Sequence, residues 1–337
     1  MTRVAVIGTG FGARVVAPAW RNQGAEVEVL SSRADDIGTA LRRSKPHIVS
    51  VHSPPYQHAT HVRLGIDSGA LVLCDKPTTP SAPTTAQLID ALGADAERVA
   101  VNFEFRFEPA RREMVRHLRS GLIGEVRRVV WVHRSAGSME PMRPYGWLFD
   151  ASLGGGWIGA WASHAVDALH GWLGEPLTVR SSEPRIDVPV RFDTDGVSHD
   201  VTAEDGLIAT LESASGVEIQ IDSSFASVHP RSPKIVIEGT LGTITNHADR
   251  RLVIDHPFGA TTETIEYGFA SATGLVDRHA APMDATVAAL MARTQSGAAL
   301  SDDGVEADLG SVTALATLDD GLRVDRVLDE LRAGRAV

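Results

Sequence analysis

Small residues near the start of the chain are spaced as in a phosphate-binding loop. The pattern is Gly8-x-Gly10-x-x-Ala13, between a predicted strand at 4–7 and a predicted helix. The first glycine permits a tight turn, the second lets N–H groups approach a pyrophosphate, and alanine allows close helix packing. A purely structural turn is the alternative, but this context favours dinucleotide binding. The residues expected to line the phosphates are Gly8, Thr9, Gly10, Phe11 and Gly12.

The end of the second predicted strand, 27–30, bears on which dinucleotide is bound. Sites specific for NAD usually have Asp or Glu about 20 residues after the glycines, where the carboxylate binds the ribose 2′-hydroxyl. Here the chain reads Ser31-Ser32-Arg33. Hydroxyls and a guanidinium suit a 2′-phosphate, so Ser32 and Arg33 favour NADP(H), with NAD(H) possible. The alternative is that Arg33 is an ordinary surface residue.

Lys76 follows the apolar run 71–74 and stands between Asp75 and Pro77. Ligands of open parallel sheets bind outside the carboxyl ends of the strands, so this lysine is expected at the ligand edge. Its ammonium could donate a hydrogen bond or a proton to a substrate oxygen beside the nicotinamide. A solvated lysine past a strand end is the alternative.

Three histidines, His52, His58 and His61, are close in sequence, but no cysteine or carboxylate completes a set of metal ligands with them. We therefore expect no metal site. Cys74, the only cysteine, is expected to be a buried small hydrophobic residue.

The elements that must position these residues alternate between strand and helix up to residue 121. Such alternation predicts a parallel sheet covered by helices on both faces. The predicted strands are 4–7, 27–30, 48–51, 71–74 and 99–103.

From residue 122 the runs become typical of a mostly antiparallel sheet, interrupted by a predicted helix at 163–173. The sequence thus predicts an α/β protein with a Rossmann domain at 1–121 and an α+β domain with an open sheet at 122–337. Its C-terminal helices could pack back on the first domain. The predicted strands are 127–133, 204–211, 217–223, 234–239 and 251–255, and the predicted C-terminal helices lie near 283–295 and 311–332.

The whole chain has 337 residues, one cysteine and a formal net charge of −11. This length suggests two domains. The charge argues against a nucleic-acid or anionic-membrane partner. No apolar run approaches the ~18 residues of a membrane helix. A cytoplasmic location fits the single cysteine.

Six motifs follow one another along nearly the whole chain: Gly8-Thr9-Gly10, Ser53-Pro54-Pro55 with His58, Asp75-Lys76-Pro77, Arg106-Phe107 with Pro109, Gly154-Gly155-Gly156, and His164 with Asp167. Their combination resembles the Gfo/Idh/MocA family of glucose–fructose oxidoreductase and inositol dehydrogenase. The resemblance implies a nucleotide-binding Rossmann domain and a second domain with substrate residues. It also implies a homodimer or homotetramer through the C-terminal sheet, and redox chemistry on an alcohol carbon of a sugar, cyclitol or polyol.

The resemblance also implies residue roles. Lys76 and His164 would be the catalytic residues, and the peptide bond before Pro77 is commonly cis in the family. Asp75 stands where the family has glutamate. On the cofactor side it implies Ser53, Pro54, His58, Asp75 and Lys76, and on the substrate side Arg106, His164 and Asp167.

Three features depart from the family pattern. Ala160 replaces the aspartate that normally partners the histidine and lysine, so that share of the proton transfer must move or vanish. Glu104 stands where the family usually has asparagine, and could supply a carboxylate. Only 14 residues separate Arg33 from Ile48, so we expect the edge strand beyond the second strand to be missing.

Four of the six tryptophans lie between positions 147 and 172. Flat aromatic faces suit the C–H faces of sugars, which makes Trp147 and, less strongly, Trp157 and Trp161 candidates for substrate stacking. Core packing is the alternative for the pair Trp157 and Trp161, and the expectation for Trp172. Polar candidates for hydroxyl recognition are Glu104, Arg143 and Tyr145.

Three functions remain open. The first is an NAD(P)-dependent oxidoreductase acting on a sugar-, cyclitol- or polyol-like alcohol or ketone, or a related imine. The second is a redox-neutral lyase, epimerase or glycosidase with a retained nicotinamide cofactor. The third is a non-catalytic dinucleotide-binding protein, which the absent aspartate favours and the retained Lys76 and His164 oppose.

Overall fold

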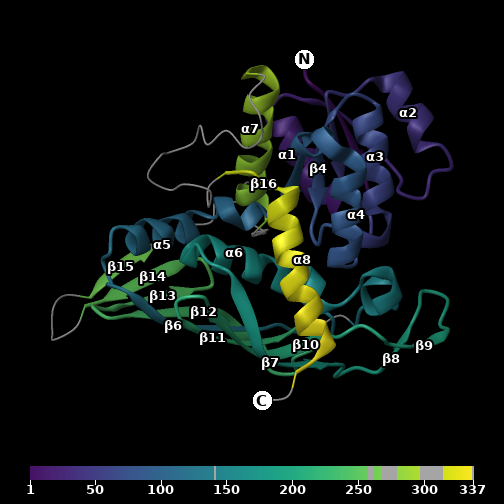
Figure 1. Ribbon diagram of the computed structural model, residues 1–337. Helices are drawn as coiled ribbons and strands as arrows, with labels where there is room; N and C mark the ends of the chain where they lie inside the picture. Colours follow the sequence, from purple (N-terminus) through teal and green to yellow (C-terminus); the bar gives the residue numbers. More distant parts are fainter. Residues whose placement is uncertain (140–141, 257–261, 268–278, 297–313, 336–337) are drawn as a thin grey trace. The chain divides into compact units, whose positions relative to one another are not determined.

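The computed structural model describes residues 1–337 except 140–141, 257–261, 268–278, 297–313 and 336–337. The chain divides into two compact units (Figure 1), of which the first comprises Met1–Glu108 with Ala270–Asp325. The second comprises Pro109–Phe269 with Arg326–Val337. The first unit therefore ends before the expected boundary at 121 and takes in much of the C-terminal region. Among the described helices, none has the length and apolar character needed to cross a bilayer.

The first unit is built on a six-stranded sheet with the order β16-β5-β4-β3-β1-β2. Its first five strands in sequence pair in parallel, and β16 joins β5 antiparallel. Nearly every residue of β1, β3, β4 and β5 is buried, as continuous apolar runs require in a sheet covered on both faces. The strands are β1 (Arg3–Ile7), β2 (Glu26–Leu30), β3 (Ile48–Val51), β4 (Leu71–Asp75), β5 (Val99–Asn102) and β16 (Ala316–Thr317).

Helices from both ends of the chain cover this sheet. Trp20 of α1 and Met283, Val287 and Leu290 of α7 are buried in one cluster with Val6 of β1. On other strands, α3 packs on β3 and β4. The helices are α1 (Ala17–Asn22), α2 (Ile37–Ser44), α3 (His58–Asp67), α4 (Ala82–Leu92), α7 (Ala280–Ser296) and α8 (Leu318–Ala333), the last beginning in the first unit and ending in the second.

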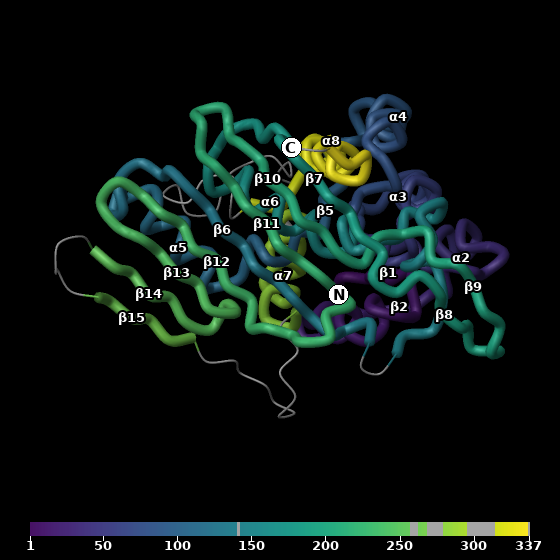
Figure 2. Tube along the Cα trace, turned by 90° about the horizontal axis from the view of Figure 1, so that it is seen from below, coloured from purple at the N-terminus to yellow at the C-terminus, as the bar shows by residue number. Residues whose placement is uncertain are grey.

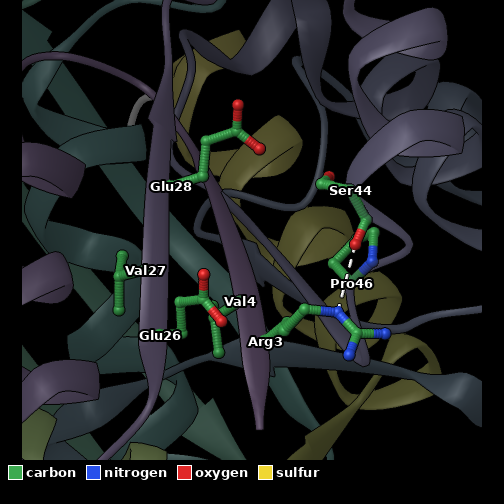
Figure 3. Close-up of a pocket in the computed structure, with 7 residues that line it drawn as sticks. All are labelled: Arg3, Val4, Glu26, Val27, Glu28, Ser44 and Pro46. Carbon is green, nitrogen blue, oxygen red and sulfur yellow. Dashed lines mark hydrogen bonds between the residues drawn. The ribbon is translucent and has the colours of Figure 1, made fainter.

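One edge strand of this sheet is β2, because the segment between β2 and β3 forms only the helix α2, and the other edge strand is β16. The Asp36 side chain accepts a hydrogen bond from the Thr39 N–H and so caps α2. A pocket of about 180 Å³ lies at the amino ends of β1 and β2 (Figure 3). Its Arg3 guanidinium donates to the carbonyls of Ser44 and Lys45, which fixes the turn into β3.

The second unit is an open eight-stranded sheet with the order β15-β14-β13-β12-β6-β11-β10-β7 (Figure 2). All neighbours pair antiparallel except β6 and β11, which are parallel. The strands are β6 (Val126–Arg134), β7 (Leu177–Arg185), β10 (Gly206–Ser213), β11 (Glu218–Ser224), β12 (Arg231–Gly239), β13 (Thr243–His247), β14 (Arg251–Asp255) and β15 (Glu263–Glu266), with a separate hairpin of β8 (Val190–Phe192) and β9 (Ser198–Asp200).

Two helices, α5 (Pro109–Arg119) and α6 (Ser163–Leu173), belong to this unit. From α5, the Arg111 guanidinium donates two hydrogen bonds to the Asp249 carboxylate, at 3.0 and 3.1 Å, and lies over the Trp131 ring of β6. These contacts attach α5 to the sheet.

Candidate active site

The glycine loop after β1 has the close contacts that its motif predicts. Gly8 has φ +138°, and a Cβ there would overlap the His52 carbonyl. A Cβ at Gly12 would lie 2.9 Å from the His52 Cβ. At Gly10, by contrast, a Cβ would meet no protein atom within 4 Å. Gly8 and Gly12 are thus required by the protein's own packing, whereas Gly10 adjoins open space, which is compatible with the close approach of a pyrophosphate.

Because a Cβ would meet close protein neighbours at Gly8 and none among the described residues at Gly10, substitutions at these two positions should affect stability and ligand binding differently. We expect Gly10→Ala to leave the free energy of unfolding within about 1 kcal/mol of wild type, the cost of ordinary glycine-to-alanine changes. It should weaken dinucleotide binding at least tenfold, measured by calorimetry. Gly8→Ala is the contrast, because its strained φ and overlap should lower the urea midpoint markedly. Equal dinucleotide binding by wild type and Gly10→Ala would contradict the assignment of the loop.

Asp75, at the end of β4, is held by the neighbouring strand ends. The His52 Nδ1 lies 3.1 Å from the Asp75 Oδ2, and the His52 Nε2 lies 2.8 Å from the Ser50 Oγ. The Lys76 N–H donates to the Asp75 Oδ1 at 2.9 Å. Burial raises the pKa of Asp75, but the hydrogen bond and charge of His52 and the charges of Lys76 and His58 outweigh it, so the pKa lies well below its usual range. The carboxylate therefore stays ionised and fixes the backbone on which Lys76 is mounted.

Lys76 itself is half-buried at the carboxyl edge of the sheet, where strand order places the ligand side, and its bond to Pro77 is cis. It is next to the ionised Asp75 in sequence, and the β4 end that bears it adjoins β3 and β5. This placement suits an ammonium that donates to a substrate oxygen.

His58 and His61 of α3 hold the turn that follows β3. The His58 Nε2 lies 2.7 Å from the Ser53 carbonyl, and its Nδ1 lies 3.1 Å from the Pro77 carbonyl. Burial lowers the pKa of His58. The His61 Nδ1 lies 2.9 Å from the Ser53 Oγ, and burial followed by the charge of His58 lowers the pKa of His61 to about 4. Pro54 remains half-buried at this edge. The His58 ring thus joins the ends of β3 and β4, which gives it a structural role, and its expected cofactor contact stays a prediction.

At the end of β2, Ser32 is half-buried and Arg33 is exposed. The Ser32 carbonyl accepts a hydrogen bond from the Gln57 side chain, and the Arg33 N–H donates to the Ser31 Oγ. The backbone of this turn is therefore fixed, and the Arg33 side chain is exposed.

After β5, two expected substrate residues have partners within the first unit. The Glu104 side chain is 1% exposed, and its Oε1 lies 2.9 Å from the Nδ1 of His279. The Arg106 guanidinium pairs with Asp320 at 3.4 Å and donates to the Ala314 carbonyl. Burial raises the pKa of Asp320, but Arg106 and further hydrogen bonds lower it overall. Arg106 thus attaches the segment after β5 to the start of α8, which favours a structural role over substrate binding.

In the second unit, the glycine triplet supports the helical segment that leads into α6. A Cβ at Gly155 would overlap the Trp147 carbonyl, and one at Gly156, with φ +105°, would overlap the Glu204 carboxylate. That carboxylate accepts a hydrogen bond from the Ile158 N–H at 3.0 Å and so caps the segment. Burial raises the pKa of Glu204.

His164 and Asp167 follow on α6, three residues apart and therefore on one face, and both are buried. Ala160 lies one turn before His164 and is partly exposed, unlike its immediate neighbours. An aspartate at position 160, as in the family pattern, would lie one turn before His164 along the chain.

The tryptophans divide into core and surface. The Trp161 ring packs edge-on against Trp131 at 5.6 Å, and Trp131 stacks on Trp172 at 5.3 Å. Trp157 stacks on Phe225 at 4.4 Å. All four tryptophan rings are buried, which supports core packing for Trp157 and Trp161, and substrate stacking by these two stays a prediction. Trp147, 37% exposed, remains a stacking candidate.

The two other polar candidates also have neighbours in the second unit. The Tyr145 ring stacks on His199 at 4.4 Å, and its hydroxyl donates to Asp150 at 3.4 Å. The Arg143 guanidinium lies over the Phe225 ring. Both side chains are therefore held against the protein. Sequence reasoning did not single out His279, because one histidine before a helix has no motif around it.

Two family models match the chain, one in each of its two units. A family model described as oxidoreductase family, NAD-binding Rossmann fold, matches residues 25–103, and a GFO/IDH/MocA C-terminal domain model matches residues 112–245. An uncharacterized oxidoreductase of Synechocystis sp. is 29% identical over 279 residues, covering 76% of this chain and 74% of that protein. A D-xylose 1-dehydrogenase (NADP(+)) of Haloferax volcanii is 27% identical over 240 residues, covering 65% and 68%.

Among solved structures, levoglucosan dehydrogenase in complex with NADH and levoglucosan superposes with a TM-score of 0.79. The two are 18% identical, and the match covers 98% of this chain and 96% of the other. At this identity the likeness concerns the fold alone.

Proposed function

The chain belongs to the GFO/IDH/MocA family of NAD-binding oxidoreductases, and we propose that it transfers hydride between a nicotinamide cofactor and a sugar-, cyclitol- or polyol-like alcohol or ketone. The observation that supports this most directly is Lys76, mounted by the ionised Asp75 at the carboxyl edge of the Rossmann sheet. The names of the relatives, a D-xylose and a levoglucosan dehydrogenase, point to the same substrate class.

The residues present fit such a cofactor. Gly8, Thr9, Gly10, Phe11 and Gly12 would hold the pyrophosphate, because the space at Gly10 is open and the loop leads into a helix. When bound, the nicotinamide supplies the hydride acceptor. Lys76 would donate to the substrate oxygen and stabilise its developing negative charge, and His164 would take or return the hydroxyl proton. Asp167, one turn along α6, would orient substrate hydroxyls with Trp147.

Cofactor consumption tests this proposal. Purified protein is mixed with NADP⁺ or NAD⁺ and a panel of aldoses, anhydrosugars and inositols, and the absorbance of reduced nicotinamide is followed. Net reduction supports the oxidoreductase. Cofactor that stays bound and is not consumed while substrate is converted would favour the redox-neutral alternative, and binding without turnover would favour the non-catalytic one.

We further propose a preference for NADP(H), read by Ser32 and Arg33. Arg33→Ala should weaken NADPH binding about tenfold to a hundredfold, the scale of a lost charge-assisted contact, and change NADH binding less than threefold. Arg43→Ala is the matched control, since Arg43 is an exposed arginine that pairs with Glu28 instead. Equal losses for both cofactors would show that Arg33 does not contact a 2′-phosphate.

Two broader proposals concern the protein's surroundings. The expected partners are a small-molecule substrate and further copies of the chain, as a homodimer or homotetramer formed through the open sheet of the second unit. A cytoplasmic location is consistent with a single thiol, Cys74, which is fully buried and whose pKa burial raises.

A further inference from the structure

His279 and Glu104 form a pair at the carboxyl edge of the Rossmann sheet. Glu104 follows β5, whereas His279 immediately precedes α7, 175 residues later in the chain. The His279 Nδ1 lies 2.9 Å from the Glu104 Oε1. The Glu104 side chain is 1% exposed, and the His279 side chain is 27% exposed. A buried carboxylate thus holds an imidazole that reaches the surface.

Two aromatic rings define where along this edge the imidazole lies. The His279 ring lies 5.4 Å from the Phe11 ring of the glycine loop and 5.2 Å from the Phe105 ring, which follows β5. These two rings belong to segments that follow β1 and β5, and the sheet order β5-β4-β3-β1-β2 places β4, whose end bears Lys76, between those two strands.

That position corresponds to the reacting half of a bound dinucleotide. A dinucleotide lies across the carboxyl edge, with its adenosine ribose at the end of β2 and its pyrophosphate at the loop after β1. The remaining half must extend toward β3, β4 and β5. His279 therefore lies on the side of the loop away from Arg33, where a substrate would approach.

We propose that His279 is a second acid/base residue of the reaction, with Glu104 as its positioning residue; this rests on the proposed oxidoreductase function. A carboxylate at Nδ1 favours the tautomer with its proton on Nδ1, which makes Nε2 the proton acceptor. In alcohol oxidation the substrate O–H bond breaks and His164 takes the hydroxyl proton. On its way to water that proton is bound at the His279 Nε2, where an N–H bond forms. The electron pair of the C–H bond leaves as hydride to the oxidised nicotinamide, and a carbonyl results. The imidazolium, stabilised by Glu104, then releases its proton to water.

The pair also explains how the chain can work with alanine at position 160. Ala160 offers no group that exchanges a proton, whereas the Glu104 carboxylate and the His279 imidazole do. A carboxylate absent from one segment would thus be replaced by a pair supplied from two others.

The experiment compares His279→Ala, Glu104→Gln and the matched control His47→Ala, since His47 is an exposed histidine at the opposite, amino end of β3. His279→Ala should lower kcat about tenfold to a hundredfold and leave cofactor affinity within threefold. Glu104→Gln should shift the acid limb of the kcat profile to lower pH, because the imidazolium loses a neighbouring negative charge. His47→Ala should change neither.

A second readout does not depend on turnover. Nitrogen-15 NMR of histidine-labelled, cofactor-free protein should show the neutral His279 imidazole protonated on Nδ1 and unprotonated on Nε2. The opposite tautomer would overturn the proposal. Provided that the wild-type protein turns over a substrate, two results for His279→Ala would also overturn the proposal. One is an unchanged kcat and pH profile, and the other is a loss confined to cofactor affinity. Absence of wild-type turnover with every substrate would instead refute the proposed function and this role together.

Discussion

Lys76→Ala is expected to lower kcat/KM by about two to four orders of magnitude, the usual scale for a positioned acid/base group. The lysine is mounted at the carboxyl end of β4 by Asp75, whose carboxylate accepts the Lys76 N–H and stays ionised. Removing the ammonium takes away the donor to the substrate oxygen in the transition state. The loss should fall on kcat more than on KM, as measured by steady-state reduction of the cofactor.

Two further lysine variants show whether charge or proton donation matters. Lys76→Met keeps the length of the side chain without its charge and should lose as much activity as alanine. Lys76→Arg keeps the charge but gives up a proton far less readily, so it should recover little. Unchanged turnover in all three variants, with cofactor still bound, would place the chemistry elsewhere in the chain.

His164→Ala should have the second largest effect, a loss of about two to three orders of magnitude in kcat. His164 is buried in the first turn of α6. The helical segment that precedes α6 in the chain is positioned by the glycine triplet and the Glu204 carboxylate. The variant should retain cofactor affinity, because the Rossmann residues are untouched. It should also flatten the pH profile of kcat in the range where an imidazole titrates.

A histidine on the same helix provides the control. His170 is also buried on α6, but its Nδ1 lies 3.0 Å from the Glu175 carbonyl, as expected of a structural residue near the helix end. His170→Ala should lower the melting temperature and leave kcat within about threefold. His164→Ala should instead lower kcat strongly and change the melting temperature less. A similar kcat for the two variants would show that His164 does not take part in the reaction.

Much of the fold could be predicted because its elements have strong local patterns. Four of the five parallel strands of the first unit, β1, β3, β4 and β5, are mostly apolar runs, whereas β2 alternates two glutamates with valines. The strands β6, β10, β11, β12 and β14 were all predicted near their observed bounds. The strands β7, β8, β9, β13, β15 and β16 were not predicted, and β16 lies within the predicted helix 311–332. In β7 and β13, polar residues interrupt the apolar pattern: Thr178, Arg180 and Glu183 in one, and Thr243, Thr245 and Asn246 in the other. These strands form because neighbouring strands complete their hydrogen bonds, which is tertiary rather than local information.

The candidate site divides in the same way. The glycine loop and Lys76 lie within a few residues of a strand end, so short motifs reveal them. The partners of Glu104 and Arg106 come from the C-terminal region, His279 in one case and Asp320 in the other, and no spacing rule connects such distant positions. Arg106 and His58 matched family positions, and Trp161 was a candidate for substrate stacking. Their side chains take part in packing, hydrogen bonds and ion pairs that only the folded chain displays.

The absence of a further strand beyond β2 in the described part of the chain also affects the tendency of the protein to aggregate. An outermost strand exposes a row of unpaired backbone groups, and flat apolar edges of this kind recruit strands from other molecules and start aggregation. In this protein that row belongs to β2, where Glu26 and Glu28 alternate with Val27 and Val29. Closely spaced carboxylates on an edge strand repel an identical copy aligned against it. Glu26 and Glu28 thus disfavour pairing of β2 with the same strand of a second molecule.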